Sequence, residues 1–423
     1  MRNKILQLKN LLIKLKQKGL GDIFLSSVFN ELIGFIVSIF IVRMFSKDEY
    51  GYYAIAYNIY GYISVFIGCG LNNGVLQYCS ELRPEGQKKA IYLFCRRAGS
   101  IFNIILLVCM PILSLILLNG QSRYYFMFMS GWPLVAYLSN YYLMRLRVIK
   151  DNRHFMLSNV ISSLVFIGTA VLLVNYSGIW GYIVSLYVKY IILVIVAHIF
   201  LKKKQDDSEI EVIRKPFKFE IICYSLICCL TNFASNILML GDVTCINYFI
   251  GDAAAVATYK TATQIPVALL FVPSNIIVFA FPYLVENNKN YVWLKKNSKK
   301  LLAGIFAVNL SIALGVIIFA PLIVNILWGE RYLDVVPILR TLTINFLVTG
   351  SFNMVFGNIM VAIKKVNVNL IKTIVSSCLN IILNILMLKN FGSIGAAYAT
   401  LIVSVGSSVF SVLYFVAWIR REK

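Results

Sequence analysis

Charged residues are scarce in this chain. Of its 423 residues, 14% are charged and 59% are hydrophobic, whereas about 25% of the residues of an average soluble protein are charged. Acidic residues are the scarcer kind, with 18 Asp and Glu against 40 Lys and Arg. So few charges cannot cover the surfaces of two or three soluble domains. The composition therefore indicates a polytopic membrane protein.

Histidines and reactive motifs are also few. The two histidines, His154 and His198, lie far apart in the sequence and suggest neither a metal site nor a nucleophile-base pair. The nine cysteines lie almost all inside apolar segments and lack metal-ligand spacing, so we interpret them as small buried hydrophobic side chains. No glycine-rich phosphate loop occurs in a polar segment. We expect no enzymatic activity, no metal and no cofactor.

Long apolar runs are what the chain has in abundance. A run of about 20 apolar residues spans the hydrocarbon of a bilayer, and continuous runs of this length form helices because each helix satisfies its own backbone hydrogen bonds. The sequence predicts an all-α polytopic membrane protein with twelve transmembrane helices, at residues 22–44, 51–78, 92–118, 124–146, 155–175, 179–201, 221–249, 257–285, 301–327, 336–361, 369–388 and 393–419.

The basic residues predict which side of the membrane each linker occupies. Of the 40 Lys and Arg, 32 lie before the first span, after the last span, or in or beside every second linker. Positive charge collects on the cytoplasmic side, so both termini are predicted to be cytoplasmic. The net charge of +22 then reflects topology and anionic lipid headgroups, and we expect no nucleic-acid partner. Membrane lipids are the expected surroundings.

The range 1–20 forms a segment of its own. Lysines alternate there with Ile5, Leu8, Leu12 and Leu15 at near-helical spacing. This pattern predicts an amphipathic helix on the cytoplasmic surface, and a frayed basic tail is the alternative.

An internal repeat divides the remainder into two halves. The shift that places Lys150 on Lys364 also places Gly178 on Gly392 and Gly181 on Gly395 without a gap, together with several neighbours. We predict an N-lobe of six helices at 21–201, a cytoplasmic linker at 202–220 and a C-lobe of six helices at 221–423. Because six crossings return the chain to its starting side, the two lobes form a parallel repeat. Transporters of this kind bind substrate between the lobes and rock them to alternate access.

A resemblance to a known family begins in the first half. The segment 42–78 contains Glu49, Tyr50 and Gly51 in a short outer turn, and then Gly70 and Leu71 late in the second span. This order resembles the start of polysaccharide-export flippases of the multidrug/oligosaccharidyl-lipid/polysaccharide exporter superfamily.

The second half is similar to the same family. Asp242 lies in the seventh span, followed by Gly251 and Asp252 in a short turn and by Tyr259. The glycine turns before the sixth and twelfth spans and the segment 328–340 also match. The resemblance covers the whole chain through many short motifs in the family's order.

The resemblance implies a function. Members of this family move a lipid-linked oligosaccharide, such as an O-antigen, capsule or exopolysaccharide repeat unit on undecaprenyl pyrophosphate, from the inner to the outer leaflet. It implies a bacterial cytoplasmic (inner) membrane, a role in lipopolysaccharide biosynthesis, and a polysaccharide polymerase and a chain-length regulator as partner proteins. We expect a monomer. Pyrophosphate and sugars must cross hydrocarbon, so such a protein needs a polar, preferably cationic cavity.

Five basic residues are candidates for the pyrophosphate. Lys189 lies near the middle of the sixth span and Lys260 near the outer end of the eighth. Arg96 and Arg97 enter the third span from the inside, and Arg43 ends the first span on the outside. Ammonium and guanidinium groups bind phosphate oxygens. The alternatives are ion pairs for the lysines, snorkelling for Lys260, and topology alone for the arginines.

Acidic and amide side chains inside the spans complete the candidate site. Glu31 and Asp242 are candidates for H+ or Na+ coupling, and neutralisation of Lys189 or Lys260 is their alternative role. Amides both donate to and accept from sugar hydroxyls, although hydrogen bonds between helices explain them equally well. The candidates for a sugar cavity are Asn30, Asn72, Asn73, Gln77, Asn232 and Asn236. Pro266, Pro273 and Pro282 predict a kink in the eighth span, and a role in packing alone is the alternative.

Other functions remain open at this point. A polysaccharide polymerase or glycosyltransferase normally carries a large outer loop, and every predicted outer linker is short. A cation-coupled multidrug exporter of the same superfamily needs a cavity biased towards carboxylates, and the intramembrane charges here are balanced. A peptidoglycan-precursor flippase is the nearest alternative, but that group usually has more than twelve helices.

Overall fold

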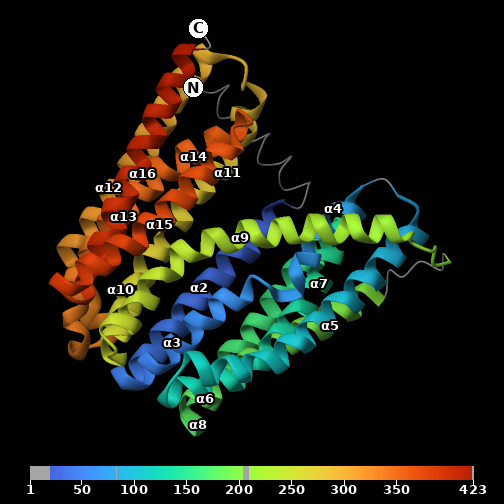
Figure 1. Cartoon of the computed structure of the whole chain (residues 1–423), viewed down its shortest axis with the longest axis horizontal. Helices are drawn as coiled ribbons and strands as arrows, with labels where there is room; N and C mark the ends of the chain where they lie inside the picture. The colour runs from blue at the N-terminus through green and yellow to red at the C-terminus, as the bar shows by residue number, and fades with distance from the viewer. Residues whose placement is uncertain (1–19, 82, 203–208, 422–423) are drawn as a thin grey trace. The chain divides into compact units, whose positions relative to one another are not determined.

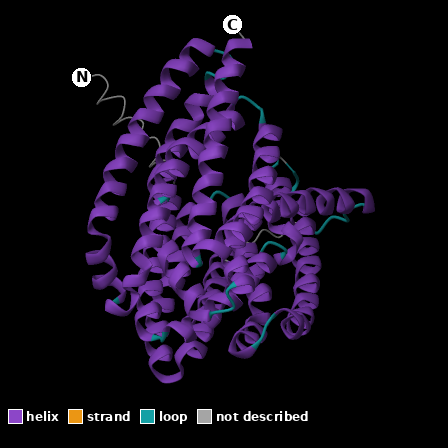
Figure 2. Ribbon diagram, turned by 60° about the vertical axis from the view of Figure 1, so that its left-hand side comes forward, coloured by secondary structure: helices purple, strands orange, loops and turns teal. Residues whose placement is uncertain are grey.

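The computed structural model describes residues 20–81, 83–202 and 209–421. In these ranges every regular element is a helix, and short connections join the helices (Figure 2). The amphipathic segment predicted at 1–20 lies outside the described residues except for Leu20, and so do residues 203–208 of the predicted linker. The choice between helix and tail at the N-terminus therefore stays a prediction.

The described residues cross a membrane twelve times. Eight helical stretches are long and apolar enough to span a bilayer. One of them, α8, has 51 residues and reverses at Gly178, where φ is 59° and ψ is −136°, so it contributes two crossings. The remaining crossings are α2, α6 with α7, and α9. The predicted all-α polytopic fold is confirmed.

The helices follow one another closely along the chain. In order they are α2 (Leu20–Met44), α3 (Lys47–Ser64), α4 (Leu71–Ser80), α5 (Glu85–Leu117), α6 (Gly120–Phe128), α7 (Trp132–Val148), α8 (Asn152–Lys202), α9 (Lys215–Phe249), α10 (Ala253–Leu269), α11 (Phe271–Glu286), α12 (Tyr291–Trp328), α13 (Val336–Val348), α14 (Met354–Ala362), α15 (Val366–Phe391) and α16 (Ser393–Arg421). Short 3-10 turns lie at Ile67–Gly70, Met129–Gly131 and Glu330–Val335, and a π-helical turn lies at Thr349–Asn353.

Side chains at the predicted outer turns start two of these helices. Before α3, the Ser46 backbone N–H and hydroxyl both donate to the Glu49 carboxylate, and the Glu49 N–H donates to the Ser46 hydroxyl. This reciprocal arrangement is a capping box. At α10, the Asp252 side chain accepts from the Ala254 N–H at 2.9 Å. The turn residues of the resembled family therefore have a local structural role here.

The chain forms two compact units. Unit 1 comprises residues up to Val37 together with Ile59–Phe233, and unit 2 comprises Ser38–Asn58 together with Ala234–Lys423. Helices α2, α3 and α9 each contribute to both units. In unit 2, helices α12 to α16 lie side by side (Figure 1). In unit 1, α5, α7 and α8 pack in the same way. The lobe limits predicted at 21–201 and 221–423 stay a prediction.

The backbone repeats itself at the interval that the sequence predicts. Lys150 and Lys364 both have positive φ, 58° and 62°, although lysine rarely adopts this conformation. A Cβ on Gly181 would lie 2.0 Å from the Leu173 carbonyl oxygen, and one on Gly395 would lie 2.3 Å from that of Met387. Each close contact lies where the chain reverses into the last span of its half. The repeat seen in the sequence is thus a repeat of local structure.

Candidate functional site

The second membrane span is broken in its middle, in the part that lies in unit 1. Between α3 and α4 three consecutive residues, Gly68, Cys69 and Gly70, have φ values of 60°, 48° and 72°. Left-handed backbone cannot continue a right-handed helix, so the helix stops and restarts here. Irregular backbone at membrane depth is tolerated where protein buries it or where it lines a cavity.

Glycine is required at this break by close contacts. A Cβ on Gly68 would lie 2.2 Å from the Tyr137 ring, and one on Gly99 of α5 would lie 2.1 Å from the same ring. The ring of Tyr137 therefore fits between the break and α5. A Cβ on Gly70 would lie 2.4 Å from the Ser225 carbonyl oxygen of α9. The break is thus packed tightly against α5, α7 and α9.

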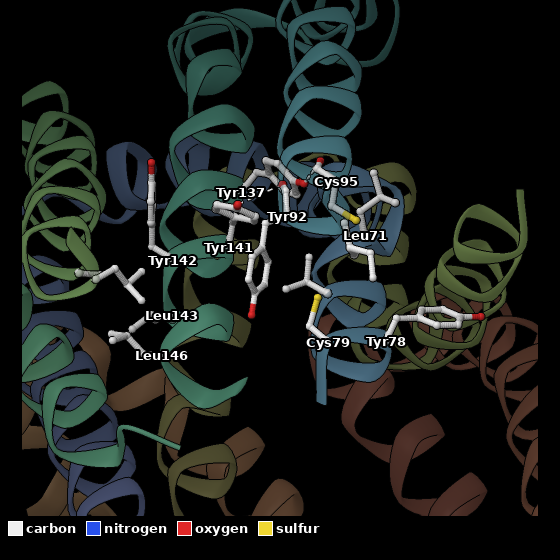
Figure 3. Close-up of a cluster of buried hydrophobic side chains, with 14 of the residues drawn as sticks. Leu71, Tyr78, Cys79, Tyr92, Cys95, Tyr137, Tyr141, Tyr142, Leu143 and Leu146 are labelled. Atoms are coloured by element: carbon white, nitrogen blue, oxygen red, sulfur yellow. Dashed lines mark hydrogen bonds between the residues drawn. The ribbon is translucent and has the colours of Figure 1, made fainter. Parts of the chain in front are cut away.

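Two tyrosines of α7 fix α5 beside the break. The Tyr137 hydroxyl donates to the Cys95 carbonyl oxygen, and the Tyr141 hydroxyl donates to that of Tyr92 at 3.0 Å. Figure 3 shows these side chains in the buried cluster that also contains Leu71. Buried hydroxyls need partners, and backbone carbonyls with a spare lone pair supply them.

A cavity opens directly after the break. Its volume is about 380 Å3, and it is lined by α4 and α9 through Asn73, Leu76, Gln77, Tyr224, Ile227, Cys228 and Asn232. Three of the six amides predicted for a sugar cavity therefore line one space. The other three lie elsewhere: Asn72 donates to the Tyr137 carbonyl oxygen at 3.5 Å, Asn30 accepts from Ser163, and Asn236 is half-buried on α9.

Unit 2 contains a second broken span at the corresponding place. The stretches Lys47–Ser80 and Ala253–Glu286 both have 34 residues, and each follows the first span of its half. The later one is interrupted at Leu270, between α10 and α11, with Pro266 and Pro273 on either side. Leu270 keeps right-handed helical backbone angles, with φ of −60° and ψ of −17°, so the interruption is a single residue between two helices. In known transporters, paired interruptions at corresponding positions of the two halves point to the binding region.

The second break also borders a cavity. This cavity of about 210 Å3 has apolar walls from α9, α10, α13 and α16, and Asp242, Tyr259, Asn345 and Thr400 are among its polar lining residues. The π-helical turn at Thr349–Asn353 contributes Thr349 to its wall. Such turns inside α-helices are frequent at functional sites.

Asp242 is the centre of a buried polar cluster. Its side chain accepts from the Tyr259 hydroxyl, from the Thr400 hydroxyl at 2.6 Å and from the Asn384 amide at 2.8 Å. Asn380 donates to the Thr400 hydroxyl at 3.1 Å and accepts from Asn384 at 3.0 Å. Asp242 is 6% exposed, and among the described residues it forms no salt bridge.

Three of the five candidate cations lie in unit 1 and two lie in unit 2. In unit 1, the Lys189 ammonium lies 5.0 Å from the Phe166 ring centroid on α8, and Arg96 and Arg97 lie on different faces of α5, half-buried and exposed respectively. In unit 2, Lys260 is half-buried and Arg43 is exposed. None of the five lines either cavity described above.

The acidic candidates differ from each other. Glu31 is exposed on α2, close enough to Lys189 to act on it electrostatically, but without a salt bridge among the described residues. Asp242 is buried with neutral partners, so within the described part of the chain it neutralises neither Lys189 nor Lys260 by a direct ion pair.

Sequence reasoning misses most of the Asp242 cluster. It identifies Tyr259 only as a family landmark, and it does not single out Asn380, Asn384 or Thr400. One signal is present, because Asn380 and Asn384 are four positions apart in an apolar helix and so share one face. Tyr224 and Cys228 of the unit 1 cavity have the same spacing, and Asn232 follows four positions after Cys228, but sequence reasoning does not use this signal.

Fold comparison defines the class of protein. The chain shares its fold with an inward-facing multidrug resistance MATE family transporter of the MOP superfamily, with a TM-score of 0.80, 14% identity and coverage of 93% of this chain and 95% of the other. It also matches the lipid II flippase MurJ in an inward closed conformation, with a TM-score of 0.74, 16% identity and coverage of 93% and 87%. The protein is a polytopic membrane protein that shares the fold of these two proteins.

Sequence comparison then gives the family. The model of the polysaccharide biosynthesis protein family matches residues 17–288, and the chain belongs to this family. An uncharacterized membrane protein of Methanocaldococcus jannaschii, MJ1068, is 24% identical over 95% of this chain and 82% of its own. Agl15 of Haloferax volcanii, a probable low-salt glycan biosynthesis flippase, is 21% identical over 42% of this chain and 38% of its own.

Proposed function

We propose that this protein is a flippase that moves a polyprenyl-pyrophosphate-linked oligosaccharide from the inner to the outer leaflet of the cytoplasmic membrane by alternating access. Membership of the polysaccharide biosynthesis family and the likeness to a glycan biosynthesis flippase support this proposal. O-antigen, capsule and exopolysaccharide repeat units all belong to this class of cargo. The two relatives are archaeal, so the proposal is not restricted to a bacterial inner membrane or to undecaprenyl carriers. A polymerase and a chain-length regulator are the proposed partner proteins.

The observation that carries the proposal is the cavity after the first break. Asn73, Gln77 and Asn232 present amide groups to one space of about 380 Å3, a volume within the usual range of about 300–1,000 Å3 for small-molecule sites. Each amide offers two donors and one acceptor oxygen, which match the mixed donors and acceptors of sugar hydroxyls. Hydrocarbon offers none, so such a cavity lowers the cost of moving a sugar across the membrane.

The pyrophosphate needs positive charge. Lys189 is the first candidate because it is half-buried in the sixth span and forms no salt bridge with a described residue. An ammonium group inside the membrane is costly unless an anion reaches it. Arg96, Lys260, Arg43 and Arg97 are the further candidates.

Asp242 is the proposed site of ion coupling. A carboxylate inside a membrane without a cationic partner either takes a proton or binds a cation. The Asn384 side-chain oxygen is buried and has no hydrogen-bond partner among the described residues. The Asp242 carboxylate and the Thr400 hydroxyl are further oxygen groups of the same cluster, and hard cations take oxygen ligands. Glu31 is the weaker candidate because it is exposed.

A cation-coupled multidrug exporter is the second candidate function. The apolar walls around Asp242 favour it, because a lipophilic cation would find both a carboxylate and apolar surfaces there. The cavity of about 210 Å3 is smaller than the usual range for drug-sized ligands. Its size therefore favours an ion with water over a drug.

The test follows labelled glycan across the membrane. The gene is deleted in a host without another exporter, and radiolabelled polyprenyl-linked glycan is measured in the two leaflets. We expect completed repeat units to accumulate on the cytoplasmic face and the wild-type chain to restore delivery. A triple variant with alanine at Asn73, Gln77 and Asn232 should restore less than about a tenth of it.

A matched control tests whether the loss of delivery comes from the cavity amides or from the loss of any three amides. Alanine at Asn175, Asn325 and Asn390, all exposed, should restore delivery fully. Normal delivery after deletion would refute the flippase proposal. If peptidoglycan precursor accumulates instead of the repeat unit, the protein is a peptidoglycan-precursor flippase.

A further inference from the structure

A second cavity in unit 1 is separate from the amide-lined cavity, and its lining includes Arg97. It lies between α5 and the chain segment that leads into α9, with a volume of about 430 Å3. Apolar side chains form most of its wall, and three charged side chains line it: Arg97, Lys218 and Glu211.

The segment 209–214 is held on α5 by backbone contacts. The Glu211 N–H donates to the Gly86 carbonyl oxygen at 3.3 Å. A Cβ on Gly86 would lie 2.5 Å from the Glu209 carbonyl oxygen, so the segment lies directly on the first turn of α5. Only glycine permits this approach. The cavity is therefore formed by a specific docking of the linker.

The charges in the cavity favour an anion. Arg97 and Lys218 outnumber Glu211, and neither basic residue forms a salt bridge with a described residue. The Lys218 ammonium lies 5.7 Å from the Phe94 ring centroid. This ring forms part of the same wall. Two basic groups at the edge of an apolar wall suit a phosphate that carries a hydrocarbon chain.

The depth of the cavity agrees with a lipid phosphate. Helix α5 ends at Leu117, and the hydrocarbon of a bilayer takes about 20 helical residues. Counting back from Leu117 places Arg97 at the boundary between hydrocarbon and headgroups on the predicted cytoplasmic side. Ile101, one turn deeper, is 60% exposed, and Ile210 and Val212 of the linker are 57% and 93% exposed. Lipid chains would cover these side chains.

We propose that this cavity binds the phosphate of an anionic bilayer phospholipid in the inner leaflet and that the bound lipid holds the inter-lobe linker on α5. Two features favour a phospholipid over the cargo. The cavity opens on the exposed apolar face of α5, and the described residues that line it include no Asn, Gln, Ser or Thr to bind sugar hydroxyls. The inference does not depend on the identity of the cargo, and it assigns Arg97 to the lipid phosphate rather than to the cargo pyrophosphate.

The test measures lipid binding directly. The purified full chain is titrated in detergent with phosphatidylglycerol, phosphatidylcholine, undecaprenyl phosphate and inorganic phosphate, and bound lipid is counted by native mass spectrometry. We expect phosphatidylglycerol to bind and the double variant R97A/K218A to bind it about 30-fold more weakly, since each basic residue near a membrane surface contributes about fivefold. E211Q should bind it more tightly.

Two further variants control for charge and shape. K295A/K296A removes two exposed basic residues from α12 and should leave binding unchanged. Ala98→Phe keeps both charges and fills the cavity, so it should weaken binding; gel filtration verifies that each variant is folded. The proposal is overturned if K295A/K296A loses as much lipid binding as R97A/K218A. It is also overturned if undecaprenyl phosphate displaces phosphatidylglycerol, or if inorganic phosphate binds as tightly as the lipid.

Discussion

At the scale of single residues, Asp242 has the most unusual surroundings. Three neutral groups, from Tyr259, Asn384 and Thr400, donate to its carboxylate, and the residue is buried. These donors satisfy its oxygens but do not balance its charge. A mobile cation or proton is the remaining way to balance it, and either would link occupancy of this site to the conformation of unit 2.

The first prediction concerns this residue. Asp242→Asn keeps the shape and most hydrogen bonds but removes the charge. We expect transport driven by a sodium or proton gradient to fall by about 5- to 150-fold, the range that corresponds to typical coupling energies of about 1–3 kcal/mol. Flipping in reconstituted vesicles, with and without each gradient, measures the effect and identifies the ion.

The control for this prediction is Asp252→Asn. Asp252 is exposed and only begins α10, and asparagine is as good a helix cap as aspartate. Gradient dependence should survive this change. An Asp242→Asn variant that keeps full gradient dependence would show that coupling lies elsewhere, with Glu31 as the next candidate.

The sequence predicts part of this site for a simple reason. A carboxylate in an apolar span stands out against its neighbours, so Asp242 can be found from the sequence. Asn384 and Thr400 are 142 and 158 residues away from it, and single polar residues are common in such helices. Their convergence depends on how α9, α15 and α16 pack, which no local pattern contains.

At the scale of elements, the two broken spans are the main finding. Apolar runs together with the alternation of basic linkers predict all twelve spans, because the bilayer imposes both. Proline predicts the break near Leu270, since proline removes a helical hydrogen bond. The break at Gly68–Gly70 is not predicted, because glycines are tolerated inside membrane helices. Only the contacts with Tyr137 and Ser225 reveal why glycine is needed there.

A glycine substitution tests the importance of the break. Gly70→Ala puts a Cβ 2.4 Å from the Ser225 carbonyl oxygen on a backbone with φ of 72°. The left-handed conformation alone costs about 1–2 kcal/mol, and the contact adds to it. We expect the midpoint of thermal unfolding in detergent to fall by several degrees. The control is Gly168→Ala, because a Cβ there has nothing within 4 Å. It should leave the midpoint unchanged or raise it. Equal midpoints for the two variants would contradict the steric argument.

At the scale of the whole molecule, the internal repeat connects fold with sidedness. Lys150 and Lys364 occupy the same left-handed turn after the fourth and tenth spans. An even number of crossings separates them, so both turns must face the same side of the membrane. The charge distribution predicts that this side is the cytoplasm.

The last prediction tests this sidedness. Reporter fusions that end after Lys150 and after Lys364 should both report the cytoplasm, and fusions that end after Asn119 and after Gly329 should both report the outside. These last two positions follow α5 and α12, which precede the fourth and tenth spans of the two halves. A cytoplasmic signal at Asn119 would remove the basis for twelve crossings. Opposite signals at Lys150 and Lys364 would contradict the parallel repeat. The two halves would then have opposite orientations, and the two broken spans would cross the membrane in opposite directions. Alternating access by two similar halves depends on the parallel arrangement.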